Sequence, residues 1–145
     1  MNPLEVVKLT ALMQSTSGRP EIVVALIDGP VLMDHPDLSN CNIRQISGNS
    51  NGSCSQANSV ACMHGTFVAG ILAANRGSAA PAICPDCTLM VRPIFFEAAG
   101  ANESLPSATP EQLADAIAEC IGAGAVIINM SLGLVPSTRD DLRQC

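Results

Sequence analysis

Three short segments carry side chains that could catalyse a reaction together. Asp28 and Ser131 each follow an apolar run, and His64 opens the small-residue segment HGTFVAG. An aspartate that holds a histidine in one tautomer lets the imidazole act as a general base toward a hydroxyl nucleophile. We therefore expect Asp28 to orient His64 and to stabilise the imidazolium that forms when His64 takes a proton.

The elements around these residues alternate between strands and helices. Helical spacing predicts one helix over residues 64–75 and a second from Pro110 to about Ile121, with Thr109 as its N-cap. Strand, helix, strand, helix, strand predicts an α/β fold with a mostly parallel sheet. Function gathers at the carboxyl ends of such strands, and His64 is predicted at a helix N-terminus. Three apolar runs predict strands buried on both faces: Ile22–Ile27, Thr88–Phe95 and Ala125–Met130.

The remaining segments frame this core and contain no internal repeat. Residues Pro3–Gln14 have the spacing of an amphipathic helix, and the polar stretch Ser15–Pro20 follows it. Ser39–Ala61 predicts a long loop or weak strands, and Ala98–Pro110 predicts another loop. We expect residues 1–20 to be a lead-in and residues 21–145 to belong to the main domain.

The composition excludes several kinds of partner. A net charge of −6 argues against nucleic acid and against anionic membranes, since both require a basic surface. No apolar run reaches the ~20 residues that a membrane-spanning helix needs. The first residues, MNPLE, lack the basic-then-apolar layout of a secretory signal. We therefore expect a cytoplasmic protein.

Seven cysteines cannot all pair within one chain. Cys84 and Cys87 form a C-x-x-C pair, but zinc usually takes two such pairs and no second one exists. A thioredoxin-type motif would follow a strand and open a helix, whereas this pair precedes a strand-like run. We expect plain thiols or a local loop disulfide at this pair, and no metal site.

Four segments in order resemble the subtilisin-like (S8) serine proteases. That family carries Asp, then His, then Ser along the chain. The resemblance implies the N-terminal part of a three-layer α/β fold, with Asp28 as the triad acid and His64 as the base. It also implies that Ser131, Leu132 and Gly133 pair with the substrate backbone by strand addition. The matching segments are the strand that ends at Asp28, His35–Leu38 (HPDL), His64–Gly70 (HGTFVAG) and Asn129–Gly133 (NMSLG).

A narrower resemblance is to the proteases that process cyanobactin precursor peptides. It implies a peptide or protein partner and, more narrowly, a ribosomal precursor peptide as substrate. The segments that carry it are Leu26–Val31 (LIDGPV), Ile83–Leu89 (ICPDCTL), Val91–Phe95 (VRPIF) and Pro106–Pro110 (PSATP).

The sequence also departs from the family pattern. Phe67 replaces a second histidine, and Asn75–Pro81 is short where many relatives insert a calcium-binding loop. We therefore expect no cofactor and no tight calcium site, although Asp37 could supply an oxygen ligand. The family's nucleophile segment, Gly-Thr-Ser, and its oxyanion-hole Asn would lie beyond Cys145. Ser131 lies in the substrate-binding phrase, and no cysteine lies in a phrase that suggests activation.

Two functions remain open from the sequence. The first is a serine endopeptidase whose serine lies outside this chain, which alone would be inactive. The second is a non-catalytic or split homologue that binds peptide, a complementing C-terminal chain or a second copy. The segment Ser137–Leu142 resembles the first turn of a helix, and half of a parallel sheet would expose an apolar edge. Both features favour an incomplete domain.

Overall fold

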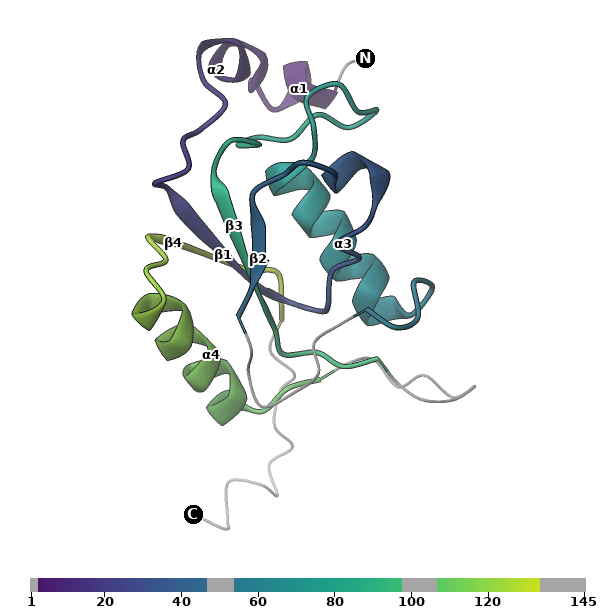
Figure 1. Ribbon diagram of the computed structural model, residues 1–145, viewed down its shortest axis with the longest axis vertical. Helices are drawn as coiled ribbons and strands as arrows, with labels where there is room; N and C mark the ends of the chain where they lie inside the picture. The colour runs from purple at the N-terminus through teal and green to yellow at the C-terminus, as the bar shows by residue number, and fades with distance from the viewer. Residues whose placement is uncertain (1–2, 47–53, 98–106, 134–145) are drawn as a thin grey trace.

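The four strands in the described part of the chain form one parallel sheet. The computed structural model describes residues 3–46, 54–97 and 107–133. The strand order is β2-β3-β1-β4 (Figure 1), so the predicted α/β fold with a parallel sheet is confirmed. The elements in chain order are α1 (Pro3–Val6), α2 (Thr10–Ser15), β1 (Val23–Asp28), the 3-10 helix η1 (Pro36–Leu38), β2 (Ile43–Gln45), α3 (Val60–Ala73), β3 (Thr88–Pro93), α4 (Pro110–Gly122) and β4 (Ile127–Met130).

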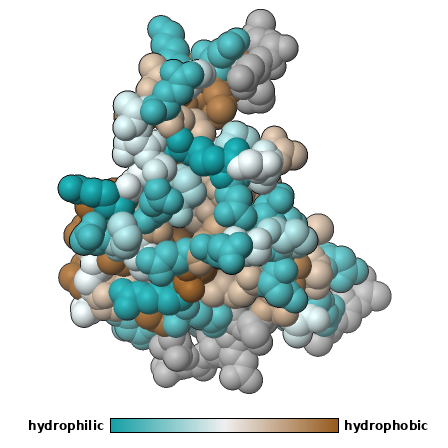
Figure 2. Space-filling model, turned by 45° about the horizontal axis from the view of Figure 1, so that its top comes forward, coloured by the Kyte–Doolittle hydropathy of each residue, from teal (hydrophilic) through white to brown (hydrophobic). Residues whose placement is uncertain are grey.

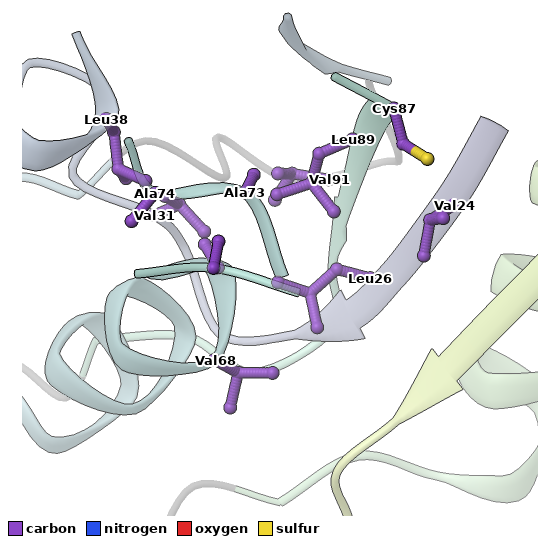
Figure 3. Close-up of a cluster of buried hydrophobic side chains, with 12 residues drawn as sticks. Val24, Leu26, Val31, Leu38, Val68, Ala73, Ala74, Cys87, Leu89 and Val91 are labelled. Carbon is purple, nitrogen blue, oxygen red and sulfur yellow. The ribbon is translucent and has the colours of Figure 1, made fainter. Parts of the chain in front are cut away.

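The central strand β1 is buried on both faces because a helix covers each one. Val24 and Leu26 pack in one apolar cluster with residues of α3, while Ala25 and Ile27 pack in a second with residues of α4. Figure 1 places the two helices on opposite sides of the sheet, and Figure 3 shows Leu26 near Val68 of α3. Alternate side chains of a strand point to opposite faces, so a continuous apolar run serves two cores. This gives the expected three layers.

Helix α4 begins and ends where its sequence predicts. The Thr109 side chain accepts a hydrogen bond from the Gln112 amide, and the Gln112 side chain accepts one from the Thr109 amide. This capping box satisfies two backbone donors at the helix start. The chain leaves the helix through Gly124, whose φ of 90° suits a residue without a Cβ.

The N-terminal segment differs from its prediction. The expected helix over Pro3–Gln14 is two short helices, α1 and α2, divided at Lys8. Lys8 adopts a φ of 58°, its amide donates to the Glu5 carbonyl, and the Leu9 amide donates to the Leu4 carbonyl. This pair of bonds is the Schellman motif that ends many helices. The prediction of one continuous helix from apolar spacing was therefore wrong, because the local capping at Lys8 ends the first helix.

Strand β4 is more exposed than the sequence predicts. We expected a strand buried on both faces, but Ile127 is 53% exposed and Met130 is 47% exposed. The reason is position: β4 pairs with β1 on one side and lies at the edge of the described sheet. Ile121 and Val126 are also exposed nearby in sequence. Figure 2 shows apolar surface at the left of the molecule, the side on which Figure 1 places α4 and β4.

Several expectations concern the loops and ends of the chain. Within the predicted loop Ser39–Ala61 the structure has the short strand β2, and α3 takes the last residues. The predicted helical turn at Ser137–Leu142 lies outside the described residues, as does most of the loop at 98–110. Among the described helices, none combines the length and the apolar character needed to cross a membrane.

Candidate active site

Asp28 and His64 are in direct contact. The His64 Nδ1 atom lies 2.7 Å from the Asp28 Oδ1 atom, and the Gly29 amide donates to the same oxygen at 2.6 Å. The Asp28 side chain is 1% exposed, whereas the His64 side chain is 49% exposed. The second oxygen, Asp28 Oδ2, is buried and has no hydrogen-bond partner among the described residues. The pair thus joins a buried carboxylate to an imidazole that reaches the surface.

Two glycines allow the strand that carries Asp28 to approach the helix that carries His64. A Cβ on Gly29 would collide with the backbone of Ala61 in α3. A Cβ on Gly65 would lie within 2.6 Å of the carbonyl oxygens of Gly29 and Pro30. Real Cβ atoms do not approach backbone so closely, so both positions require glycine. The close packing of β1 on α3 follows from these two residues and brings the carboxylate to the imidazole.

The sequence predicted that His64 opens its helix, and this prediction is wrong. Helix α3 begins at Val60, and His64 is its fifth residue. The Ser59 side chain caps the helix by accepting a hydrogen bond from the Cys62 amide at 3.2 Å. The prediction was wrong because the apolar spacing becomes regular only after His64, while the cap lies in the polar stretch before it.

The start of α3 is held by two further groups. Cys54 and Cys62 form a disulfide, with their Cα atoms 5.6 Å apart. Glu97, which follows β3, accepts hydrogen bonds from Ser55, Gln56 and Ser59. Burial alone would raise the pKa of the Glu97 carboxyl, but these hydrogen bonds stabilise the carboxylate and lower the pKa to about 2. The sequence did not predict this role for Glu97.

No sequence signal could have found these two restraints. Glu97 lies 38 to 42 positions from its hydrogen-bond partners, and seven cysteines allow many pairings.

Ser131, Leu132 and Gly133 follow β4 at the same carboxyl end of the sheet as Asp28. The register pairs Ile27 with Met130, so Asp28 at the end of β1 and Ser131 just after β4 occupy equivalent positions on neighbouring parallel strands. The Asn129 side-chain amide donates to the Ser131 hydroxyl at 2.8 Å. Ser131 and Leu132 are partly buried and Gly133 is exposed. Their role in binding substrate stays a prediction.

The C-x-x-C pair is a turn with free thiols in this structure. Cys84 and Cys87 are unpaired, and the Cys87 amide donates to the Cys84 carbonyl at 3.1 Å. Burial, followed by the neighbouring Cys87, raises the pKa of the Cys84 thiol to about 11. A thiol of this kind is a poor nucleophile at neutral pH.

Metal binding stays at the level of expectation. Among the described residues, the side chains of Cys54, Cys62 and Glu97 gather within 4.8 Å of one another. The two sulfurs are bonded to each other, so they offer no thiolate to an ion. The expectation that no cofactor is needed, and the weaker one of calcium at Asp37, both stay predictions.

The sequence matches a known family model over almost its whole length. The model describes the subtilase family and matches residues 19–144. The chain belongs to the subtilase family. Among curated proteins, no sequence matches this subtilase significantly. The predicted division at residue 20 stays a prediction.

Solved structures place this subtilase near the proteases that mature cyanobactins. A mutant of the protease domain of PatA, a patellamide maturation protease, is 30% identical with a TM-score of 0.74, covering 83% of this chain and 42% of that chain. The prenylagaramide maturation protease PagA is 31% identical with a TM-score of 0.70, covering 88% of this chain and 40% of that chain.

A psychrophilic subtilisin-like protease, Apa1 from Pseudoalteromonas sp. AS-11, is more distant. It is 27% identical with a TM-score of 0.66, covering 96% of this chain and 30% of that chain. The chain therefore spans less than half the length of each of these solved structures.

Proposed function

We propose that this chain carries the acid and the base of a serine endopeptidase of the subtilisin type. Asp28 is the orienting acid, His64 is the general base, and the serine lies outside residues 1–145. The single observation that carries the proposal is the 2.7 Å contact between His64 Nδ1 and a carboxylate that is almost fully buried. A half-exposed imidazole oriented by a buried acid has the arrangement that serine proteases use.

In this proposal each nitrogen of His64 has its own role. Because Nδ1 faces the Asp28 carboxylate, Nδ1 carries the proton and donates it to Oδ1. The other nitrogen, Nε2, is then a free base that can take the proton of a serine hydroxyl. The imidazolium that forms lies beside the buried negative charge, where the attraction is stronger than in water. His64 then gives the proton from Nε2 to the leaving amine, and the acyl-enzyme is formed.

The location of the serine is supported by the length of the relatives. This chain covers 42% and 40% of the two maturation proteases, which leaves more than half of each without a counterpart here. The family resemblance puts the nucleophile segment beyond Cys145. The polypeptide of residues 1–145 is then inactive by itself.

The proposed substrate is a peptide that binds in extended form beside β4. Ser131 to Gly133 follow an edge strand, so their backbone could add a substrate strand to the sheet. Two of the similar solved structures are named as maturation proteases of patellamide and prenylagaramide. We infer from this similarity that the substrate is a ribosomal precursor peptide, cut by this protein in the cytoplasm.

A serine-directed phosphonate probe tests the proposal. The gene should be expressed with the reading frame beyond Cys145, because a labelled protein requires both the serine and a working base. We expect labelling of the extended protein, loss of labelling in His64→Ala, and unchanged labelling in His35→Ala. His35 is the matched control because it is the other of the two histidines and caps η1 instead of contacting Asp28.

A second function is favoured by the exposed apolar residues at the β4 edge, where Ile127 and Met130 are about half exposed. A split or non-catalytic homologue would use this edge to bind a complementing chain or a second copy. An extended protein that resists the phosphonate but binds peptide would support this alternative and contradict the first proposal.

A further inference from the structure

We propose that Glu97 and the Cys54–Cys62 disulfide form a redox-sensitive clamp that positions His64 against Asp28. The proposal rests on the proposed function, since it concerns the same acid–base pair. Glu97 and the two cysteines are positioning residues, because they contact the start of α3 and do not touch the reacting atoms.

The Glu97 carboxylate gathers the loop that leads into α3. Its Oε2 accepts hydrogen bonds from the Ser55 amide at 2.8 Å and from the Ser55 hydroxyl. Its Oε1 accepts from the Gln56 amide at 2.8 Å and from the Ser59 hydroxyl at 3.0 Å. Charge-assisted hydrogen bonds of this kind are stronger than neutral ones. One side chain therefore holds three positions of the loop.

The same short segment also touches the acid. The amides of Ile94 and Phe95 donate to the Asp28 carbonyl oxygen at 2.8 and 3.3 Å. Glu97 follows two residues later and holds the start of the helix that carries His64. The segment from Ile94 to Glu97 thus connects the strand end of the acid with the helix of the base.

The disulfide provides the covalent half of the clamp. Cys54 precedes the loop, and Cys62 lies in the first turn of α3, two residues before His64. Ser59 joins the two halves, because its hydroxyl group donates to Glu97 and accepts from the Cys62 amide. Both restraints therefore act on the helix turn immediately before His64.

One side of α3 packs in the core through Val68 and Ala69, whereas its solvent-facing side offers little restraint. Met63, Phe67 and Ile71 on α3 are 52%, 67% and 43% exposed, and His64 itself is held by its contact with Asp28. A misplacement of about 1 Å in a catalytic group can cost on the order of 10²-fold in rate. The core packing of α3 brings His64 to Asp28, and the hold on the first turn of α3 adds to the precision of that orientation.

Reduction of the disulfide opens the clamp by a balanced exchange with a dithiol. A thiolate of the dithiol attacks Sγ of the partly buried Cys54, the bond between the two protein sulfurs breaks, and Cys62 leaves as a thiolate that takes a proton. The second thiol of the reagent then displaces Cys54, which also takes a proton. The dithiol is oxidised to its cyclic disulfide, and the protein gains two electrons and two protons.

NMR of the imidazole groups tests the clamp in the chain itself. The protein has two histidines, so His64 can be assigned by comparison with His35→Ala. In the oxidised protein we expect a downfield, slowly exchanging Nδ1 proton on His64. This signal should broaden or disappear on dithiol reduction, in Cys54→Ser and in Glu97→Gln, and reoxidation of the wild type should restore it.

Two matched variants serve as controls. Glu119→Gln removes a carboxylate that pairs with Arg92 at 2.6 Å on the α4 side of the sheet. Cys84→Ser removes a partly buried thiol near the other end of α3, where the backbone amide of Cys84 donates a hydrogen bond to the Leu72 carbonyl. Neither should change the His64 signal. An unchanged signal after reduction would overturn the proposal, and so would collapse of all resonances, His35 included, since that would make the disulfide a global stabiliser.

The activity of the extended protein separates this inference from the proposed function. We expect reduction to lower kcat by about 10²-fold with little change in KM, because substrate contacts remain while the base is misplaced. Equal kcat values for the oxidised and reduced enzyme would contradict the clamp. Failure of the proposed function would appear differently: the His64 signal would respond to reduction, but the extended protein would not react with the phosphonate.

Discussion

The Asp28 carboxylate is asymmetric in its contacts. Oδ1 accepts from His64 and from the Gly29 amide, while Oδ2 is buried without a partner among the described residues. An unpartnered buried oxygen costs free energy, and such costs gather at functional sites. Asp28 and His64 were both predicted as a pair from the sequence, because each lies in a recognisable segment. The contact distance and the orphaned oxygen could come only from the structure.

Glu97 leads to a prediction about acid stability. The pKa of its carboxyl is about 2 in the folded protein, below the ordinary value of 4.5. The clamp therefore contributes stability that is fully present above pH 4.5 and is lost as the pH falls through about 2. We expect Glu97→Gln to lower the urea midpoint near neutral pH, and the difference from wild type to shrink toward pH 2. A difference that stays constant over this range would contradict the assigned hydrogen bonds.

At the scale of elements, the approach of β1 to α3 depends on Gly65. A methyl group there would meet the carbonyl oxygens of Gly29 and Pro30, so Gly65→Ala should destabilise the protein by about 1–3 kcal/mol. Gly70 is the matched control on the same helix, because a Cβ there meets nothing within 4 Å. Gly70→Ala should instead stabilise by about 0.5–1 kcal/mol, since alanine loses less entropy in a helix.

Chemical denaturation of the two glycine variants, side by side, measures both effects. Equal midpoints for Gly65→Ala and wild type would show that the helix can move away from β1 at no cost. The close approach would then not be what places the imidazole at the carboxylate.

Helices and strands whose boundaries depend on neighbouring residues were predicted from the sequence, and those that depend on distant residues were not. The start of α4 was predicted because its signals, Thr109 as the N-cap and Pro110 at the first helical position, are adjacent in the sequence. The start of α3 was missed because its cap, Ser59, lies in a polar stretch before the regular apolar spacing, and the hydrogen bond that holds Ser59 is accepted by Glu97, far along the chain. The burial of β4 was overestimated for a similar reason, because the sequence of a strand does not determine which strands lie beside it in the sheet.

At the scale of the whole molecule, the exposed apolar edge of the sheet at β4 is the surface on which we expect another protein chain to bind. Edge strands with apolar residues tend to pair with other chains. We expect the chain to associate with increasing concentration, and Ile127→Lys to reduce this association. Val6→Lys is the matched control, because Val6 in α1 is 61% exposed and Ile127 is 53% exposed. Sedimentation velocity measures the effect; equal association of the two variants would place the contact elsewhere.

The central claim is that Asp28 orients His64 as the base of a protease, and Asp28→Asn tests it most directly. The asparagine keeps the shape of the side chain but cannot hold His64 in the tautomer with its proton on Nδ1. The measurement is kcat for hydrolysis of a peptide substrate by the protein extended beyond Cys145, with circular dichroism to show that the variant folds. We predict a fall of ~10⁴-fold, as in other triads. A folded Asp28→Asn variant whose kcat stays within about tenfold of wild type would contradict the account.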